Sequence, residues 1–258
     1  MRRHRLPRHA ARRELTPAMR PLLDSGILSI LHTGEITTCE LLPWGSNYTF
    51  LVAIKGPSGT VLAVYKPKAG EIPLWDFPEG TLYLREYAAF LVSEALHWSL
   101  VPPTTIREGP YGIGSVQLYV DADPDVHYFN LDAKHRSALR RIALFDHVVN
   151  NADRKAGHCL EDRNGRLWAV DHGLTFHAVP KLRTVIWDFR GQPIPEDLLV
   201  DLVRLKGNLM RPGPLVEQLS SLLSASEMVA LHRRVNALIE ARTFPHPGPG
   251  RSVPWPLV

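Results

Sequence analysis

Cysteine is scarce in this sequence, since Cys39 and Cys159 are the only two among 258 residues. Two cysteines so far apart form neither the dense framework of a small disulfide-rich domain nor a Cys-x-x-Cys metal motif. We therefore interpret both as free thiols, which fits a reducing compartment and predicts a cytoplasmic protein.

Long apolar runs are missing as well. No stretch approaches the roughly 18 apolar residues of a membrane-spanning helix. The basic start of the chain is not followed by the apolar segment that a secretory signal needs. The sequence therefore predicts a protein without a transmembrane segment.

The excess of basic over acidic residues comes from one end of the chain. Six arginines in residues 1–16 exceed the formal net charge of +4, so the remainder is slightly acidic. A short basic run is typical of a solvated extension. We predict a disordered tail over residues 1–16 and expect no nucleic-acid partner.

Strand patterns dominate residues 17–120, which we predict to be a β-rich first lobe. Residues 35–65 alternate apolar and polar side chains in three runs with turn residues between them, which indicates an antiparallel meander. Residues 104–107 and 114–120 predict two more strands. Between these groups, residues 82–97 have the apolar spacing of an amphipathic helix.

Helical patterns dominate residues 121–244, the predicted second lobe. Residues 132–149 form one amphipathic pattern, and three more follow from Pro195 onward. The last of these opens with Ser224 and Glu227 in the spacing of a capping box. Five prolines in residues 245–258 predict an extended or disordered tail.

Acids, amides and histidines gather in residues 144–176. The dipeptide Asn164-Gly165 favours a hairpin turn between strands at residues 158–161 and 166–170. Because neighbouring strands lie about 4.8 Å apart, such a hairpin brings Asp153 and Asp171 within reach of one small ligand. That arrangement suits a metal-bound phosphate.

Lys66 closes a predicted strand in line with apolar side chains, so its ammonium group needs a counter-charge. Glu86 in the following helix is our candidate, with rivals at Glu71, Glu79 and Glu94. The loop at residues 43–47 is small and polar enough for its backbone N–H groups and Ser46 to approach a phosphate. A simple tight turn explains that loop equally well.

Four motifs stand in order along the chain: VYKPKAGE at residues 64–71, REYAAFLVSEAL at 85–96, DHVVNNADRKAGH at 146–158 and AVDHGLTF at 169–176. Together they resemble the phosphatidylinositol 3-/4-kinase-like family, especially type II phosphatidylinositol 4-kinases and a group of actinobacterial relatives. The resemblance implies an α+β, two-lobed protein-kinase-like fold with an antiparallel β-rich N-lobe and a mostly helical C-lobe.

The resemblance also implies how ATP is held. Lys66 would hold the ATP phosphates and Glu86 would orient Lys66. Ser46 and Asn47, in the small polar loop, are our candidates for a further contact to the nucleotide. The connector against which adenine packs would consist of Gln117, Leu118, Tyr119 and Val120.

The implied catalytic centre lies in the third and fourth motifs. Asp153, in the pair with Arg154, would orient or deprotonate an attacking hydroxyl group, and Asp171 would bind Mg²⁺ between the β- and γ-phosphates. His158 replaces the usual metal-binding asparagine. Because imidazole suits Mn²⁺ better than Mg²⁺, His158 is predicted to contact either a softer metal or a phosphate.

These motifs do not specify the hydroxyl acceptor. The cysteine-rich insertion of membrane-attached type II lipid kinases is absent, so the hydroxyl acceptor could be a lipid, a protein or a small molecule. Lys181 and Arg183 could meet an anionic substrate or be plain solvated charge.

Three other functions compete with a kinase. A catalytically weak pseudokinase that regulates a partner is favoured by His158, and an AMP-transferase would bind ATP the other way round. A metal-dependent hydrolase built on four histidines lacks a recognisable zinc spacing. Those histidines are His147, His158, His172 and His177.

Overall fold

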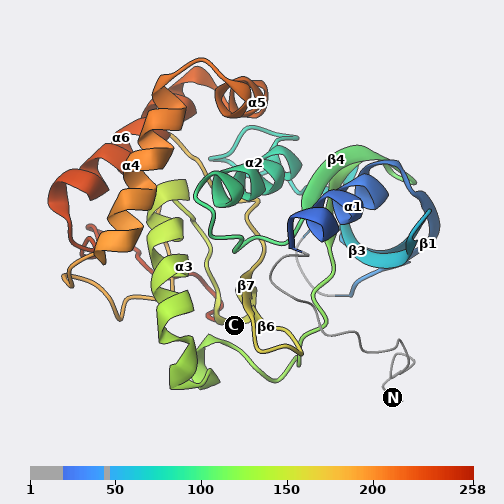
Figure 1. The fold of residues 1–258 in the computed structure, drawn as a ribbon, viewed down its shortest axis with the longest axis horizontal. Helices are drawn as coiled ribbons and strands as arrows, with labels where there is room; N and C mark the ends of the chain where they lie inside the picture. Colours follow the sequence, from blue (N-terminus) through green and yellow to red (C-terminus); the bar gives the residue numbers. More distant parts are fainter. Residues whose placement is uncertain (1–19, 44–46) are drawn as a thin grey trace.

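An antiparallel five-stranded sheet forms the first lobe of the computed structural model, which describes residues 20–43 and 47–258 (Figure 1). The strand order is β1-β2-β3-β5-β4. The elements of this lobe are α1 (Arg20–Thr33), β1 (Glu35–Leu41), β2 (Phe50–Gly56), β3 (Gly59–Pro67), η2 (Lys68–Gly70), β4 (Thr104–Gly109) and β5 (Gly112–Leu118). The predicted strands are thus present.

The alternation of side chains along β3 explains how the sheet makes both a core and a binding surface. Ala63 and Tyr65 are fully buried in the apolar cluster under α1. Val64 and Lys66, which point to the opposite face, line the cavity between the lobes. The predicted position of Lys66 at the end of this strand is confirmed.

Helix α2 (Leu82–Ala95) lies between the sheet and the helices of the second lobe (Figure 1). It packs against β4 and β5 on one side and against α4 and α5 on the other. Its buried face includes Arg85 and Glu86 besides the apolar residues that the amphipathic pattern predicted.

The second lobe is mostly helical, as predicted. Its elements are η3 (Tyr128–Asn130), η4 (Ala133–His135), α3 (Arg136–Val149), η5 (Ala156–His158), β6 (Cys159–Glu161), β7 (Leu167–Ala169), α4 (Glu196–Met210), α5 (Pro214–Leu222) and α6 (Ala225–Ala241). One large apolar core joins α2, α3, α4 and α6. The predicted capping box of Ser224 and Glu227 opens α6.

The starts of two elements are delayed relative to the prediction by a preceding 3-10 turn. Helix α3 begins at Arg136 rather than residue 132, because the Asp132 carboxylate accepts the backbone N–H of Lys134 at 2.9 Å and closes a separate 3-10 turn. The first strand of the hairpin begins at Cys159 because residues 156–158 form another such turn. The hairpin turn contains Gly165 at φ +77°, a conformation that glycine adopts without strain.

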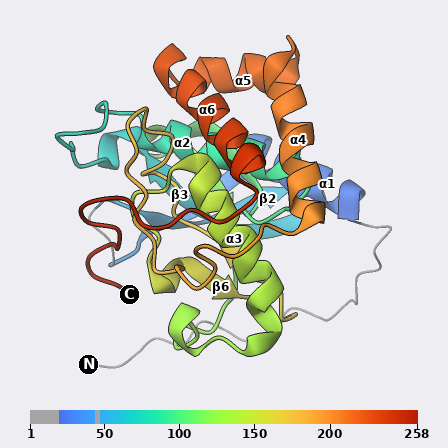
Figure 2. The ribbon, with the colours of Figure 1, turned by 90° about the vertical axis from the view of Figure 1, so that its left-hand side faces the viewer.

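Residues 242–258 contain no helix or named strand but lie against the second lobe. Phe244 is buried and exchanges backbone hydrogen bonds with the segment at residues 191–192. Figure 2 shows this segment crossing α3 on its way to the β6 hairpin. There the carbonyl oxygen of Leu257 accepts the backbone N–H of Ala156 at 2.8 Å. The proline-rich segment is therefore extended and docked.

The predicted basic tail at residues 1–16 and the predicted phosphate contact of Ser46 lie outside the described residues. Across residues 20–43 and 47–258, no helix combines the length and apolar character needed to cross a membrane.

Candidate functional site

A cavity of about 530 Å³ lies where the two lobes meet. This volume falls within the range of small-molecule and cofactor sites. The predicted residues that line it are Asn47, Lys66, Glu86, Gln117, Leu118, Tyr119, Val120, Asp153, His158 and Asp171. Residues more than 100 positions apart in the chain thus come together in one cavity.

The predicted ion pair between Lys66 and Glu86 is present in this cavity. The Lys66 Nζ also donates to Asp171 Oδ1 at 2.8 Å. Burial opposes the lysine charge, but the two carboxylates outweigh burial and raise the pKa of Lys66. The ammonium group is therefore permanently charged and lies where it can meet phosphate oxygens.

Glu86 uses both of its oxygens. While Oε1 accepts from Lys66, Oε2 accepts the backbone N–H of His172 at 2.9 Å. The side chain is almost fully buried. A single carboxylate of α2 therefore connects β3 to the segment that follows β7.

Asp171 occupies a strained backbone position, with φ at +60°. Residues other than glycine rarely adopt this conformation, and it costs about 1–3 kcal/mol where it occurs. The side chain is 49% exposed toward the cavity. Lys66 holds the pKa of Asp171 well below its usual range despite the opposing effect of burial, so the carboxylate is ionised and open to a cation.

His158 lies on the other side of Asp171, with Nε2 at 3.3 Å from Oδ2. Burial lowers the pKa of His158 to about 4, so the ring is neutral at pH 7. The backbone N–H of Lys155 points at Nδ1 at 3.4 Å, which favours the tautomer with the proton on Nε2. In that tautomer His158 is a hydrogen-bond donor toward the cavity.

Asp153 faces the same cavity from the loop that follows α3. Its backbone N–H donates to Asn151 Oδ1 at 3.0 Å, and Lys155 Nζ lies 3.3 Å from its carboxylate. Burial raises the pKa of Asp153, against the effect of Lys155. A carboxylate with a raised pKa is a better proton acceptor than an ordinary surface aspartate.

Arg154 lies beneath this loop and, within the described residues, is the one predicted site residue that does not line the cavity. It is fully buried and pairs with Asp146 at 3.0 Å. It also donates to the carbonyl oxygen of Val170 at 2.7 Å and lies 2.7 Å from His172 Nε2. Arg154, predicted as a catalytic-site residue together with Asp153, therefore holds the loop and the hairpin in register from outside the cavity.

The connector between the lobes is held by hydrogen bonds to neighbouring strands. Gln117 donates through Nε2 to Thr104 Oγ1 at 2.9 Å, and the N–H of Tyr119 donates to Leu62 O at 3.0 Å. The connector therefore has a fixed position at the wall of the cavity.

The two basic residues after the hairpin have local partners. Lys181 pairs with Asp76 at 2.8 Å and lies over the Trp75 ring at 5.1 Å. The backbone of Arg183 exchanges hydrogen bonds with Asn151 and Arg154. These contacts tie the segment to both lobes and leave Lys181 paired.

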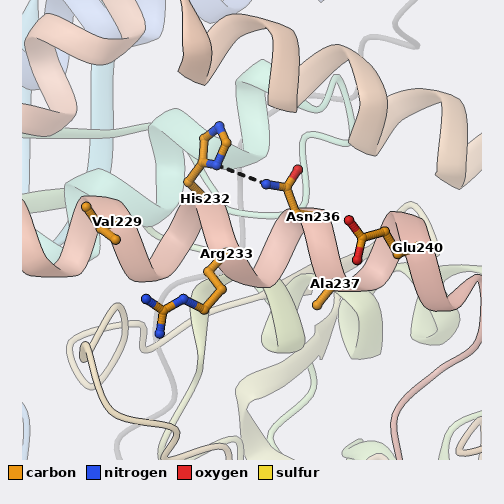
Figure 3. Close-up of a pocket in the computed structure, with 6 residues that line it drawn as sticks. All are labelled: Val229, His232, Arg233, Asn236, Ala237 and Glu240. Carbon is orange, nitrogen blue, oxygen red and sulfur yellow. Dashed lines mark hydrogen bonds between the residues drawn. The ribbon is translucent and has the colours of Figure 1, made fainter.

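A second, shallower pocket lies on α6 and is lined by residues of that helix alone (Figure 3). It contains His232 and Asn236, which hydrogen-bond to each other at 3.1 Å, and Glu240. None of the predicted site residues lines it, so it is separate from the cavity between the lobes.

Among the residues in or near the cavity that were not predicted as kinase site residues, four support the site through polar contacts. They are Asp146, Asn151, Lys155 and His172. All four lie within the two motifs that carry Asp153 and Asp171, so their places in those motifs were the available signal. Pattern alone does not separate a buried supporting acid such as Asp146 from a solvated one.

These features define a two-lobed α+β fold of the kinase-like class. Among solved structures, hydra Fam20 (solved with sugar) superposes with a TM-score of 0.51 at 16% identity, covering 85% of this chain and 88% of that one. The crystal structure of the Golgi casein kinase gives a TM-score of 0.47 at 16% identity, over 85% of this chain and 75% of that one.

Sequence comparison identifies the nearer relatives. Protein Rv2133c of Mycobacterium tuberculosis is 40% identical over 263 residues, which covers 88% of this chain and 94% of that protein. The chain belongs to the same family as Protein Rv2133c. Phosphatidylinositol 4-kinase gamma 4 of Oryza sativa is 30% identical over 109 residues, 35% of this chain and 19% of that protein. No family model matches the chain.

Proposed function

We propose that this protein is an ATP-dependent phosphotransferase of the phosphatidylinositol 3-/4-kinase-like group, acting on a hydroxyl-bearing acceptor. The observation that carries this proposal is the linked set Lys66, Glu86 and Asp171, which faces Asp153 across one cavity. The partial similarity to the rice phosphatidylinositol 4-kinase supports the choice of group.

Lys66 is the proposed phosphate-binding residue. Its ammonium group neutralises charge on the ATP phosphates, and Glu86 keeps it in place. Phosphoryl transfer requires mainly positioning and positive charge on the transferring oxygens. The Nε2–H of His158 adds a neutral donor toward the same oxygens.

The donor set around Asp171 fits a hard divalent ion shared with ATP. Among residues 20–43 and 47–258, no group of three acidic, histidine or cysteine side chains forms a self-sufficient metal site. Mg²⁺ commonly binds through one or two carboxylates and takes its other ligands from phosphates and water. Asp171 would hold Mg²⁺ or Mn²⁺, and the ion would supply positive charge between the β- and γ-phosphates.

Asp153 is the proposed residue for the acceptor. A hydroxyl group that enters beside it is oriented by its carboxylate and loses its proton to it. Lys155, 3.3 Å away, is a further cation beside the transferred group.

The test uses γ-labelled and α-labelled ATP with Mg²⁺ or Mn²⁺, incubated separately with lipid, protein and small-molecule acceptors. Transfer of the γ label to an acceptor, or release of labelled phosphate, is expected. Transfer of the α label would instead identify an AMP-transferase.

Two variants assign the roles. Asp171→Asn should abolish metal-dependent nucleotide binding measured by calorimetry, because the charged oxygen facing the ion is lost. Asp153→Ala should retain nucleotide affinity and lose turnover. Unchanged ATP affinity in Asp171→Asn with each metal would contradict the site assignment.

A nucleotide-binding pseudokinase is the second candidate. The tautomer of His158 favours it, since a donor at this position does not supply the second metal ligand that kinases commonly use there. Metal-dependent ATP binding without release or transfer of either label would establish this alternative.

A further inference from the structure

Arg85 precedes Glu86 on α2 but points away from the cavity, into the second lobe. It is 1% exposed. Its Nη1 donates to the carbonyl oxygen of Thr175 at 2.7 Å, and its Nη2 lies 2.7 Å from Glu227 Oε1. The guanidinium group also lies over the Phe77 ring at 5.1 Å.

Glu227 is held at a fixed position by the start of α6. Its Oε2 accepts the backbone N–H and the hydroxyl group of Ser224, each at 2.8 Å, while Oε1 pairs with Arg85. The capping box and the helix N-terminus both stabilise a carboxylate at this place. Glu227 is therefore a rigid anchor for a residue of α2.

The two adjacent residues of α2 reach the same segment from different directions. Glu86 accepts the N–H of His172, and Arg85 donates to Thr175 O three residues later. Successive side chains of a helix point about 100° apart. A rotation or outward shift of α2 that breaks one contact therefore strains the other.

We propose that Arg85 and Glu227 are positioning residues that hold α2 where Glu86 meets Lys66 and the backbone next to Asp171. The proposal rests on the proposed function and deepens it. Kinases of several classes control activity by moving the corresponding helix or by ordering a phosphorylated loop. Here a buried ion pair to α6 performs that task without a phosphate.

Stability alone does not account for such a pair. Replacing a buried ion pair with well-packed apolar residues is often neutral or stabilising, whereas removing one partner is costly. The argument for positioning is geometric, because Arg85, which the pair anchors to α6, also donates to Thr175 O in the segment that carries Asp171.

The first test is Glu227→Gln, which keeps the shape and the capping hydrogen bonds of the side chain and removes its charge. Two quantities are measured: the rate at which an amine-reactive reagent labels Lys66, by peptide mass mapping, and the affinity for ATP with Mg²⁺, by calorimetry. We expect faster labelling and affinity weaker by about tenfold, the size of a typical coupling between sites.

The matched control is Glu240→Gln. Glu240 lies on the same helix, in the pocket on α6, and is exposed (Figure 3). The labelling rate of Lys66 and the affinity for ATP should both equal those of the wild type.

The second test separates positioning from stability. The double variant Arg85→Met, Glu227→Gln removes the ion pair and its buried positive charge, keeps the capping hydrogen bonds of residue 227, and lacks the donor to Thr175 O. Its denaturation midpoint should return toward the wild-type value, while Lys66 labelling stays fast and ATP affinity stays low. This design also covers the case in which Glu227→Gln folds poorly.

An unchanged rate of Lys66 labelling in Glu227→Gln would overturn the proposal. A double variant with the slow labelling rate and the ATP affinity of the wild type would overturn it as well. A wild-type protein that binds no nucleotide would refute the proposed function instead. In that case the Lys66 labelling rates alone decide whether Arg85 and Glu227 position α2.

Discussion

Asp146 and Arg154 form the most deeply buried ion pair beside the cavity, and Asp146→Asn tests whether the loop of Asp153 depends on it. Both side chains are fully buried. The Nε of Arg154 donates to Oδ1 at 3.2 Å and to Oδ2 at 3.0 Å, and its Nη2 donates to Oδ1 at 3.0 Å. Burial alone would lower the pKa of Arg154, but the Asp146 charge outweighs it and raises that pKa.

The expected loss follows from the geometry. Asparagine has one acceptor oxygen where aspartate has two, so an amide NH₂ group would face a guanidinium donor, and the buried positive charge would lose its counter-charge. Breaking one side of a buried pair costs about 3–5 kcal/mol. For a chain of this size that loss lowers the melting temperature by on the order of 10 °C.

The assay is guanidinium denaturation followed by tryptophan fluorescence. Trp168 lies on β7, and Trp187 follows Val185, whose backbone N–H donates to the carbonyl oxygen of Arg154. Asp146→Asn, Arg154→Met and the double variant form a cycle that isolates the pair. The double variant should lose clearly less stability than the two single losses added together. A loss below about 1 kcal/mol for Asp146→Asn, or strict additivity, would refute the reasoning.

Two further predictions concern other positions. Burial lowers the pKa of His147 to about 4, so as pH falls below about 6.5 the unfolded chain binds a proton that the folded protein excludes. Between pH 7 and pH 5 this lowers the free energy of unfolding by about 2 kcal/mol. Denaturation curves of His147→Gln should therefore show a smaller dependence of that free energy on pH. An equal dependence in both proteins would contradict this. Gly114→Ala should destabilise by about 1–3 kcal/mol and weaken ATP binding, because the added Cβ would lie 2.4 Å from the carbonyl oxygen of Lys66. The control is Gly207→Ala on α4, where the added methyl group meets open space, so thermal melts should show equal or higher stability. A Gly114→Ala protein that melts like the wild type would disprove the predicted clash with Lys66.

The parts of the fold set by local periodicity were predictable. The alternation around Lys66 and the helical spacing around Glu86 each depend on neighbouring residues. The patterns left other glutamates open as partners of Lys66, and the resemblance selected Glu86, which forms the ion pair. The Asn164-Gly165 turn likewise predicted the hairpin. The kinase-like fold came from the order of four motifs rather than from any single pattern.

Contacts between distant segments were not predictable. The Asp-Arg sequence at residues 153–154 gave no sign that one side chain faces the cavity while the other is fully buried on Asp146. Arg85 beside Glu86 presents the same problem, because its partner Glu227 lies 142 positions away. Periodicity predicts which face of a helix is buried, but not which buried charge it meets.

The docked course of residues 242–258 has a practical consequence for handling the protein. Val258 lines the cavity between the lobes, and Leu257 is bonded to the loop of Asp153. A purification tag or reporter fused after Val258 would begin at the mouth of the cavity and compete with ligands there. Fusions at that position should therefore be compared with the cleaved protein before any binding constant is interpreted.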